Sequence, residues 1–168
     1  MFLAAKMDDT AQCSLGVMYY KGYGVEKNYD EAYKYFSLAT KKGDANAQNN
    51  LGNCYYNGQG VKQNYEEAVK YYKLAADQGD ADAQNNLGVC YRYGRGVKQD
   101  YEEAVKYYKL AADQGDADAQ NNLGNCYYNG QGVKQNYEEA VRYYKLAAAQ
   151  GNEYAINMLS KLNIEPKK

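Results

Sequence analysis

The sequence contains no histidine and no tryptophan, and its 168 residues include one proline and two phenylalanines. Without histidine, the chain lacks the side chain that most often acts as a general base or activates a nucleophilic thiol or hydroxyl. Potential metal ligands are not clustered at short spacing either. We therefore expect a protein that is not an enzyme and that holds no cofactor and no metal.

The chain also lacks an excess of charge of either sign, with 20 basic and 21 acidic residues. Balanced charge creates no global field that attracts nucleic acid or an anionic membrane, so we expect neither a nucleic-acid partner nor membrane insertion. Tyrosine is abundant, with 22 copies, and supplies much of the side-chain volume that leucine and phenylalanine usually provide in a core. A buried tyrosine needs a hydrogen-bond partner for its hydroxyl, which predicts hydrogen bonds between helices in the core.

No signal peptide is visible at the N-terminus. Residues 1–7, MFLAAKM, have no basic start, no apolar run of sufficient length and no cleavage site. Phe2 to Ala5 resembles the end of the second helix of a repeat, so this stub either covers the first helix or is cut from a longer array. The missing signal peptide and the cysteines, which we expect to be reduced, favour a cytoplasmic location. The first of these observations is weak, because a truncated N-terminus would lack a signal peptide in any case.

The chain is a 36-residue unit written four times. Residues 44–79 are repeated with six differences at 80–115 and with three at 116–151, and 8–43 is a divergent copy. A period of this length is typical of a solenoid. We number these segments repeats 1 to 4 in chain order and predict one solenoid domain over 1–168, with a capping helix at 152–163 and a polar tail at 164–168.

Each repeat encodes two helices. Residues 45–57 place Ala47, Leu51 and Cys54 on one face at 100° per residue, with Asp44 as the N-cap and Asn57-Gly58 as the stop. We call this first helix of a repeat helix A. Helix B begins after Asn64, which with Glu67 forms the pattern of a reciprocal capping box. Glu66 and Lys70 are expected to pair on its outer face.

The glycine-rich linker at 58–63 also invites interpretation as a phosphate-binding loop. Such a loop follows a strand and ends in Gly-Lys-Ser or Gly-Lys-Thr, and neither feature is present in this sequence. Because the linker recurs in every repeat, we interpret it as part of the repeat architecture, with Val61 packed under the turn.

The framework of the repeat is similar to that of the Sel1-like family, a relative of the tetratricopeptide repeats. The matching residues are Ala45, Ala47, Gln48, Leu51, Gly52, Tyr55, Gly58, Gly60, Val61, Ala68, Tyr71 or Tyr72, Ala75, Ala76 and Gly79. The resemblance covers 8–151 and implies an all-α fold, a right-handed α-solenoid of tandem antiparallel helix pairs. It also implies an adaptor that holds proteins or peptides on a concave face formed by successive A helices.

Four cysteines, Cys13, Cys54, Cys90 and Cys126, are expected to be reduced. The last three recur every 36 residues, and stacked repeats separate such positions by more than the roughly 7 Å that a disulfide allows between Cα atoms. Some secreted, cysteine-rich members of the Sel1-like family form a disulfide between a cysteine of helix B and one of the next helix A. This chain has no cysteine in any helix B. We interpret three of the thiols as small, semi-buried core groups.

Repeat 3 differs from repeat 2 mainly on the helix A face opposite the apolar stripe. The changes there include Val89, Arg92 and Tyr93, which we expect to be exposed. Binding specificity and neutral drift both explain such changes, although the outer face of helix B has not drifted. Asparagine amides on this face match the donor and acceptor of a peptide group, and tyrosine and arginine are common interface anchors. Hydrogen bonds between neighbouring A helices are the alternative role of these asparagines.

We therefore expect a protein- or peptide-binding scaffold that is monomeric and binds an extended peptide or protein. The alternative is a glycan or cell-wall-binding module, since tyrosine and asparagine also suit sugars. The expected ligand-binding residues are Lys21, Asn46, Asn49, Asn53, Tyr56, Asn57, Asp82, Asn85, Val89, Arg92, Tyr93, Asn121, Asn125, Tyr128 and Asn129.

Overall fold

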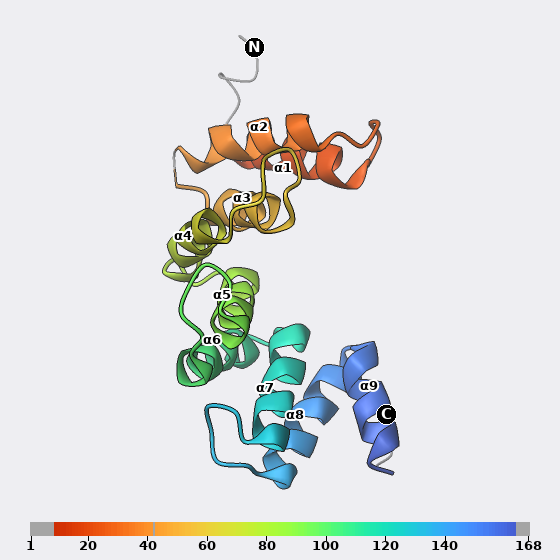
Figure 1. Cartoon of the computed structure of the whole chain (residues 1–168). Helices are drawn as coiled ribbons and strands as arrows, with labels where there is room; N and C mark the ends of the chain where they lie inside the picture. The colour runs from red at the N-terminus through yellow and green to blue at the C-terminus, as the bar shows by residue number, and fades with distance from the viewer. Residues whose placement is uncertain (1–8, 42, 164–168) are drawn as a thin grey trace. The chain divides into compact units, whose positions relative to one another are not determined.

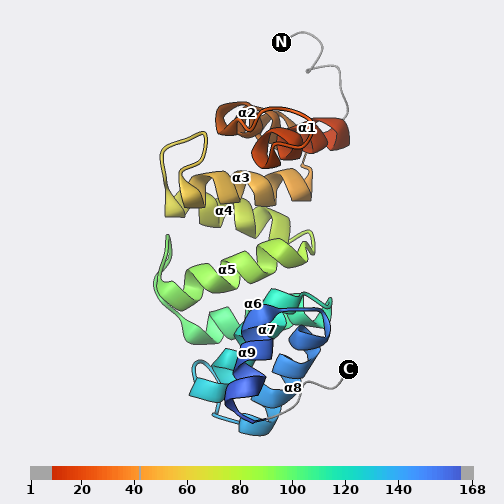
Figure 2. The same cartoon turned by 90° about the vertical axis from the view of Figure 1, so that its right-hand side faces the viewer.

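The structure, a computed structural model, describes residues 9–41 and 43–163, and these residues form nine α-helices and no strand (Figures 1 and 2). The helices are α1 (Asp9–Lys21), α2 (Tyr29–Thr40), α3 (Ala45–Asn57), α4 (Tyr65–Ala76), α5 (Ala81–Tyr93), α6 (Tyr101–Asp113), α7 (Ala117–Asn129), α8 (Tyr137–Ala149) and α9 (Glu153–Lys161). The predicted all-α fold of tandem helix pairs is confirmed. The stub at 1–7 and the tail at 164–168 lie outside the described residues.

The chain divides into two compact units, Met1–Ala83 and Gln84–Lys168, which we call unit 1 and unit 2. The division falls within the first turn of α5, so unit 1 contains α1 to α4 and unit 2 contains most of α5 with α6 to α9. The two helices of a repeat pack together, as α3 with α4 and α7 with α8. Between repeats, α2 packs on α3 in unit 1 and α6 packs on α7 in unit 2. Each unit therefore joins neighbouring repeats through a helix B and the following helix A.

Helix A has the predicted ends. The Asp44 carboxylate accepts a 2.6 Å hydrogen bond from the amide of Ala47, and Asp116 accepts the equivalent bond from Ala119 at the start of α7. At the other end, Gly58 has φ 68° and its amide donates to the carbonyl of Cys54. Glycine suits this left-handed cap because it has no Cβ.

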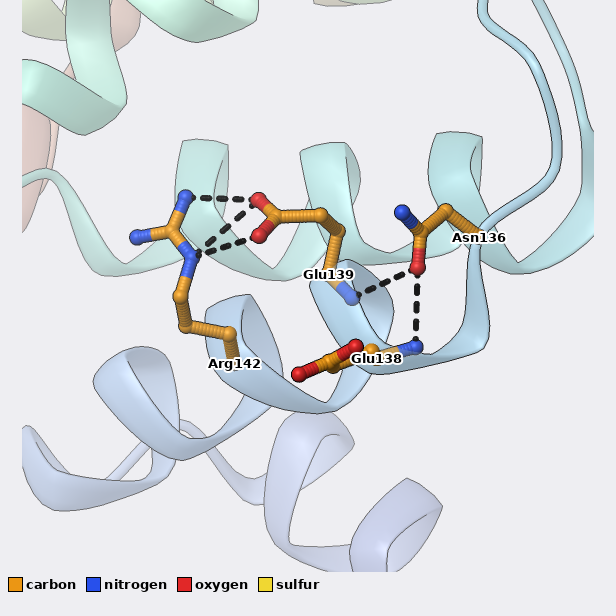
Figure 3. A network of polar contacts seen from close by, with 4 residues as sticks. All are labelled: Asn136, Glu138, Glu139 and Arg142. Carbon is orange, nitrogen blue, oxygen red and sulfur yellow. Dashed lines mark hydrogen bonds and ion pairs between the residues drawn. The ribbon is translucent and has the colours of Figure 1, made fainter.

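Helix B begins differently from the prediction. The side-chain oxygen of Asn136 accepts 3.1 Å hydrogen bonds from the amides of Glu138 and Glu139, as expected (Figure 3). The reciprocal bond of a capping box is replaced, because the amide of Asn136 donates to the carbonyl of Tyr127 at 2.9 Å. The loop thus ties the start of helix B to the end of helix A.

The capping glutamate pairs forward along its own helix. Glu139 accepts from Arg142 at 2.8 Å (Figure 3), and in α4 the ion pair of Lys70 is made with Glu67 at 3.3 Å. The predicted pairing of Lys70 with Glu66 is therefore wrong. Because the amide of Asn64 is already bonded within the loop, the carboxylate of Glu67 is available to Lys70, which lies three residues further along the helix. These pairs are exposed and add little stability.

A glycine of helix A packs against an aromatic ring of helix B in every repeat. A Cβ on Gly52 would lie 2.6 Å from the ring of Tyr72, and one on Gly124 would lie 2.7 Å from Tyr144. These rings are among the largest fully buried side chains of the described residues. Close approach of the two helices therefore depends on the missing side chain of the glycine.

In repeats 2 and 4, the second glycine of the linker packs against the preceding repeat. In unit 1, a Cβ on Gly60 would overlap the backbone carbonyl of Tyr29, and in unit 2, one on Gly132 would overlap that of Tyr101. Both glycines also have positive φ, 72° and 68°. The linker is therefore in direct contact with the start of the previous helix B and has no room for a side chain there.

The C-terminal helix α9 packs against the last repeat. Ala155 and Leu159 are fully buried in a cluster with Tyr144 and Ala147, and Met158 and Leu162 are partly buried against it. The side chain of Asn152 caps α9 by accepting from the amide of Ala155. This helix occupies the position of a fifth helix A.

The four cysteines are free and buried. Cys54, Cys90 and Cys126 are inaccessible to solvent, so the expected semi-buried position is wrong and these thiols belong to the core. Burial raises the pKa of Cys54 and Cys90 to about 12. The pKa of Cys126 is raised to about 11, because the positive charge of Arg92 opposes the effect of burial.

Candidate functional site

A pocket of about 500 Å³ opens between the A helices of unit 2. Its lining residues are Asn85, Arg92, Tyr93, Asp118, Asn121, Asn122, Asn125 and Tyr154. They come from α5, α7 and the first turn of α9, and we call the site the α5–α7 pocket. Five of these residues, Asn85, Arg92, Tyr93, Asn121 and Asn125, belong to the set expected from the sequence.

Two side-chain hydrogen bonds fix the register of α5 and α7. The amide of Asn122 donates to the side-chain oxygen of Asn85 at 3.0 Å, and the guanidinium of Arg92 donates to the side-chain oxygen of Gln131 at 3.3 Å. Both bonds advance in the same direction along the two helices, so α5 and α7 lie side by side and run the same way. The first bond is one of the contacts between A helices considered as the alternative role of the asparagines.

Asn121 is the most buried polar residue of the pocket. Its side chain is 8% exposed, and its side-chain oxygen has no hydrogen-bond partner among the described residues. An unsatisfied buried polar atom costs about 1–3 kcal/mol, so the pocket is built at the expense of stability. The oxygen has almost no exposed surface, so a ligand N–H would remove that cost once the Asn121 amide rotates toward the pocket.

Arg92 and Tyr93 form the basic, aromatic end of the pocket. The guanidinium of Arg92 lies 5.4 Å from the centre of the Tyr93 ring, and that of Arg95 lies at the same distance. In repeats 2 and 4 the positions of Arg92, Tyr93 and Arg95 are occupied by tyrosine, asparagine and glutamine, respectively. Three of the six substitutions of repeat 3 therefore gather in space as one cluster.

Arg92 is half-buried rather than exposed, which corrects the expectation for this residue, whereas Tyr93 is 55% exposed. The Arg92 charge also acts on its buried neighbours. Burial raises the pKa of Tyr108 above its usual range, and the guanidinium opposes that rise. The long arginine side chain therefore rests on the packed interior and keeps its head at the pocket.

Some of the expected binding asparagines have a structural role. The side-chain oxygen of Asn125 accepts from the hydroxyl of Tyr144 at 2.8 Å, and in unit 1 Asn53 accepts from Tyr72 at the same distance. These bonds join helix A to helix B of one repeat, not one A helix to the next. They are the hydrogen bonds between helices that the abundance of tyrosine predicted.

The remaining expected residues are only partly brought together. Asn129 is bonded to the backbone of Asn125 and Tyr128 packs edge-on against Tyr137, outside the pocket. Val89 is half-buried and does not line the pocket either. In unit 1, Lys21, Asn46, Asn57 and Asp82 are exposed, Asn53 and Tyr56 are half-buried and Asn49 is buried.

Unit 1 has its own pocket of about 340 Å³ between α1 and α3, lined by Thr10, Cys13, Ser14, Val17, Asp44, Asn46 and Asn50. Asn46 is its single member from the expected set. The A-helix face is therefore hollowed in both units. The chemistry differs, because the lining in unit 1 contains no cation and no aromatic ring.

Sequence reasoning missed Asp118, Asn122 and Tyr154. Asp118 occupies the same repeat position as Asn46 and Asp82, both of which were expected in the site, so the internal alignment already pointed to it. Tyr154 also holds this position, in the helix that was treated only as a cap. It is 75% exposed, and a large aromatic on a helix A position was the available signal.

The described residues contain no group of three or more histidine, cysteine or acidic side chains that could hold a metal. Within the same residues, every helix is too short or too polar to cross a lipid bilayer.

Four tandem helix pairs with a capping helix define an α-solenoid repeat protein. The Sel1 repeat pattern matches residues 10–44, 45–80, 81–116 and 117–152. The chain therefore belongs to the Sel1 repeat family, and the resemblance seen in the sequence is confirmed.

Solved structures similar to this chain include a protective antigen of uropathogenic Escherichia coli with 40% identity and a TM-score of 0.85. The match covers 95% of this chain and 35% of the antigen, so the chain spans about a third of that protein. A Sel1 repeat protein from Oxalobacter formigenes is 37% identical with a TM-score of 0.85, over 95% of this chain and 67% of the other. Helicobacter pylori cysteine rich protein B is 28% identical with a TM-score of 0.62, over 82% and 99%. No curated protein matches the sequence.

Proposed function

We propose that this chain is a non-catalytic scaffold that binds an extended peptide or a protein segment on the A-helix face, chiefly in the α5–α7 pocket. The observation that carries the proposal is the unsatisfied side-chain oxygen of Asn121, buried in the wall of an open polar pocket. A peptide N–H is a donor of the right kind for this acceptor, which it reaches when the Asn121 amide rotates toward the pocket.

The other groups of the pocket suit the same ligand. Arg92 makes one long hydrogen bond to an uncharged glutamine, which leaves most of its five N–H donors for acceptors of a ligand. Tyr93 and Tyr154 add exposed rings, and tyrosine and arginine are enriched among the residues that dominate protein interfaces. Membership of a repeat family that forms interaction scaffolds agrees with this chemistry.

A glycan is the second candidate ligand, favoured by the same two exposed tyrosines beside asparagine amides. A random-peptide display selection and a glycan array, both probed with the full chain, separate the two candidates. We expect selected peptides to bind and the array to stay blank. Binding to glycans with no selected peptide would contradict the proposal.

Exchange of the repeat 3 surface for that of repeat 2 tests the location. We expect Arg92→Tyr with Tyr93→Asn to weaken the selected peptides by about 1–3 kcal/mol, the usual effect of losing an interface anchor. Lys106→Tyr is the matched control, because it replaces an exposed cation by tyrosine on α6 of the same repeat. If titration calorimetry gave equal losses for both variants, or none for either, the α5–α7 pocket would not be the binding site.

A further inference from the structure

The α5–α7 pocket has opposite charges at its two ends. Arg92 lies in the last turn of α5, beside Gln131, which follows the end of α7. Asp118 lies in the first turn of α7 and accepts a 2.7 Å hydrogen bond from Asn152, at the start of α9. Since α5 and α7 run the same way, the cation marks the C-terminal end of the pocket and the carboxylate marks the N-terminal end.

Neither charge is neutralised within the described residues. Arg92 interacts with uncharged groups, which are the amide of Gln131, the ring of Tyr93 and the buried hydroxyl of Tyr108. Asp118 is exposed and is bonded to the uncharged amide of Asn152. An exposed tyrosine accompanies each charge, Tyr93 at the basic end and Tyr154 at the acidic end. Both ends are therefore available to ligand groups of opposite charge.

The register of the helices gives the separation of the two ends. Asn85 is bonded to Asn122, and from this level Arg92 lies seven positions further along α5 while Asp118 lies four positions back along α7. At about 1.5 Å per residue these positions are about 16 Å apart along the helix direction. An extended peptide rises about 3.3 Å per residue, so residues four apart are separated by about 13 Å and point to the same side. Long charged side chains cover the difference.

We propose that the α5–α7 pocket selects an extended peptide segment that carries an acidic and a basic side chain four residues apart. The acidic side chain contacts Arg92, the basic one contacts Asp118 and the ring of Tyr154, and the asparagines between them contact the peptide backbone. This inference rests on the proposed peptide-binding function and specifies the ligand. The pocket of unit 1 has no cation and does not share this preference.

Defined peptides test the inference on the full chain. The set consists of eight-residue peptides of threonine and valine, blocked at both ends and labelled for fluorescence anisotropy. Two carry glutamate and lysine four residues apart, one in each order, and three carry two glutamates, two lysines or two glutamines at the same positions. We expect one of the mixed-charge peptides to bind at least about fivefold more tightly than the other four, a gain typical of exposed charge pairs.

Reversal of the pocket gives the sharper readout. An extended chain has a direction, so the parent protein should prefer one order of glutamate and lysine. The double variant Arg92→Glu with Asp118→Lys should prefer the opposite order. Arg92→Gln and Asp118→Asn, which remove one charge each, should each abolish most of the preference, and melting curves confirm folding of all variants. Asp118→Asn is isosteric and Arg92→Gln keeps a polar side chain, so the single variants test the inference even if the double variant fails to fold.

The outcomes separate this inference from the function on which it rests. Display-selected peptides that bind without any preference for mixed charge, or a preference for two glutamates, would overturn the inference and leave the scaffold function intact. An order preference unchanged by charge reversal would overturn it as well. Failure of both the defined and the selected peptides to bind would reject the scaffold function itself, and the inference with it.

Discussion

The hydroxyl of Tyr144 donates a 2.8 Å hydrogen bond to the side-chain oxygen of Asn125, and repeat 3 keeps only half of this pair. Its tyrosine, Tyr108, is fully buried, but Val89 replaces the asparagine. The Tyr108 hydroxyl consequently has no hydrogen-bond partner among the described residues. Repeat 1 avoids the conflict because Phe36, which has no hydroxyl, occupies the tyrosine position.

Restoring the asparagine should therefore stabilise the protein. We expect Val89→Asn to raise the free energy of unfolding by about 1 kcal/mol, the net contribution of one buried hydrogen bond, as measured by urea denaturation. In a Tyr108→Phe background the same substitution should bring no gain, because the donor is gone. Equal effects in the two backgrounds would show that Val89 and Tyr108 are not coupled.

Gly124→Ala tests the contact between helices A and B. Alanine has a higher helix propensity than glycine by about 1 kcal/mol, yet its Cβ would lie 2.7 Å from the ring of Tyr144. Overpacking of this kind costs about 1–3 kcal/mol, so we expect net destabilisation and a lower melting temperature. In a Tyr144→Ala background the clash is absent, so Gly124→Ala should stabilise the protein there through the higher helix propensity of alanine. A single variant more stable than the parent would contradict the packing described above.

The last helix should contribute strongly to stability. Leu159 of α9 is fully buried, and truncation of a buried leucine costs about 2–5 kcal/mol, so Leu159→Ala should lower the melting temperature markedly. Deletion of 153–168 should have a larger effect and cause aggregation. Tyr154→Ala is the control, because Tyr154 is largely exposed. A deletion variant that melts like the parent would show that α9 is not a cap.

The buried thiols predict loss of stability at alkaline pH. Burial raises the pKa of Cys54 and Cys90 from 9.0 to about 12, so above pH 9 the unfolded chain releases protons that the folded chain retains. Stability then falls as the pH rises from about 9 towards 12. The raised pKa values of Tyr108 and Tyr144 act in the same direction at higher pH.

Denaturation curves between pH 8 and 11 measure this fall. A variant with alanine at Cys54, Cys90 and Cys126 should start less stable, because the thiols fill core space, but should lose less stability over the same range. A slope equal to that of the parent protein would assign the pH effect to the buried tyrosines and to Cys13, whose pKa is also raised by burial to about 12.

Helix positions were predictable because the local signals recur at a fixed spacing. Asp44 and Gly58 are short-range caps whose effect does not depend on the rest of the fold, and they delimit α3 as expected. The partner of the Glu67 carboxylate depends on the path of the linker. The linker brings the amide of Asn64 to the carbonyl of Tyr55, so this amide does not bind Glu67. A pattern of four residues carries no information about that path, and the predicted capping box was therefore incomplete.

The candidate site was predictable to a similar degree. Comparison of the repeats singled out Arg92 and Tyr93, because they break an otherwise strict repetition. The division of labour among the asparagines was hidden, since Asn121 and Asn125 have identical chemistry and differ only in whether a tyrosine hydroxyl reaches them. Nevertheless, the sequence alone shows that repeat 3 combines Val89 with Tyr108, whereas repeat 1 combines a valine with Phe36. Repeat 3 is therefore the repeat in which the tyrosine hydroxyl has lost its asparagine.

The close packing of Gly132 against the carbonyl of Tyr101 also limits how such a chain can change in length. The linkers of repeats 2 and 4 meet helix B of the previous repeat with the second glycine in a fixed position, while their ends are bonded to helix A of their own repeat. Insertion of a single residue into the linker breaks one of these contacts. Duplication or loss of a whole 36-residue segment preserves both, so the array is able to lengthen or shorten by complete repeats, and each copied repeat brings a further A-helix surface on which a different ligand preference can evolve.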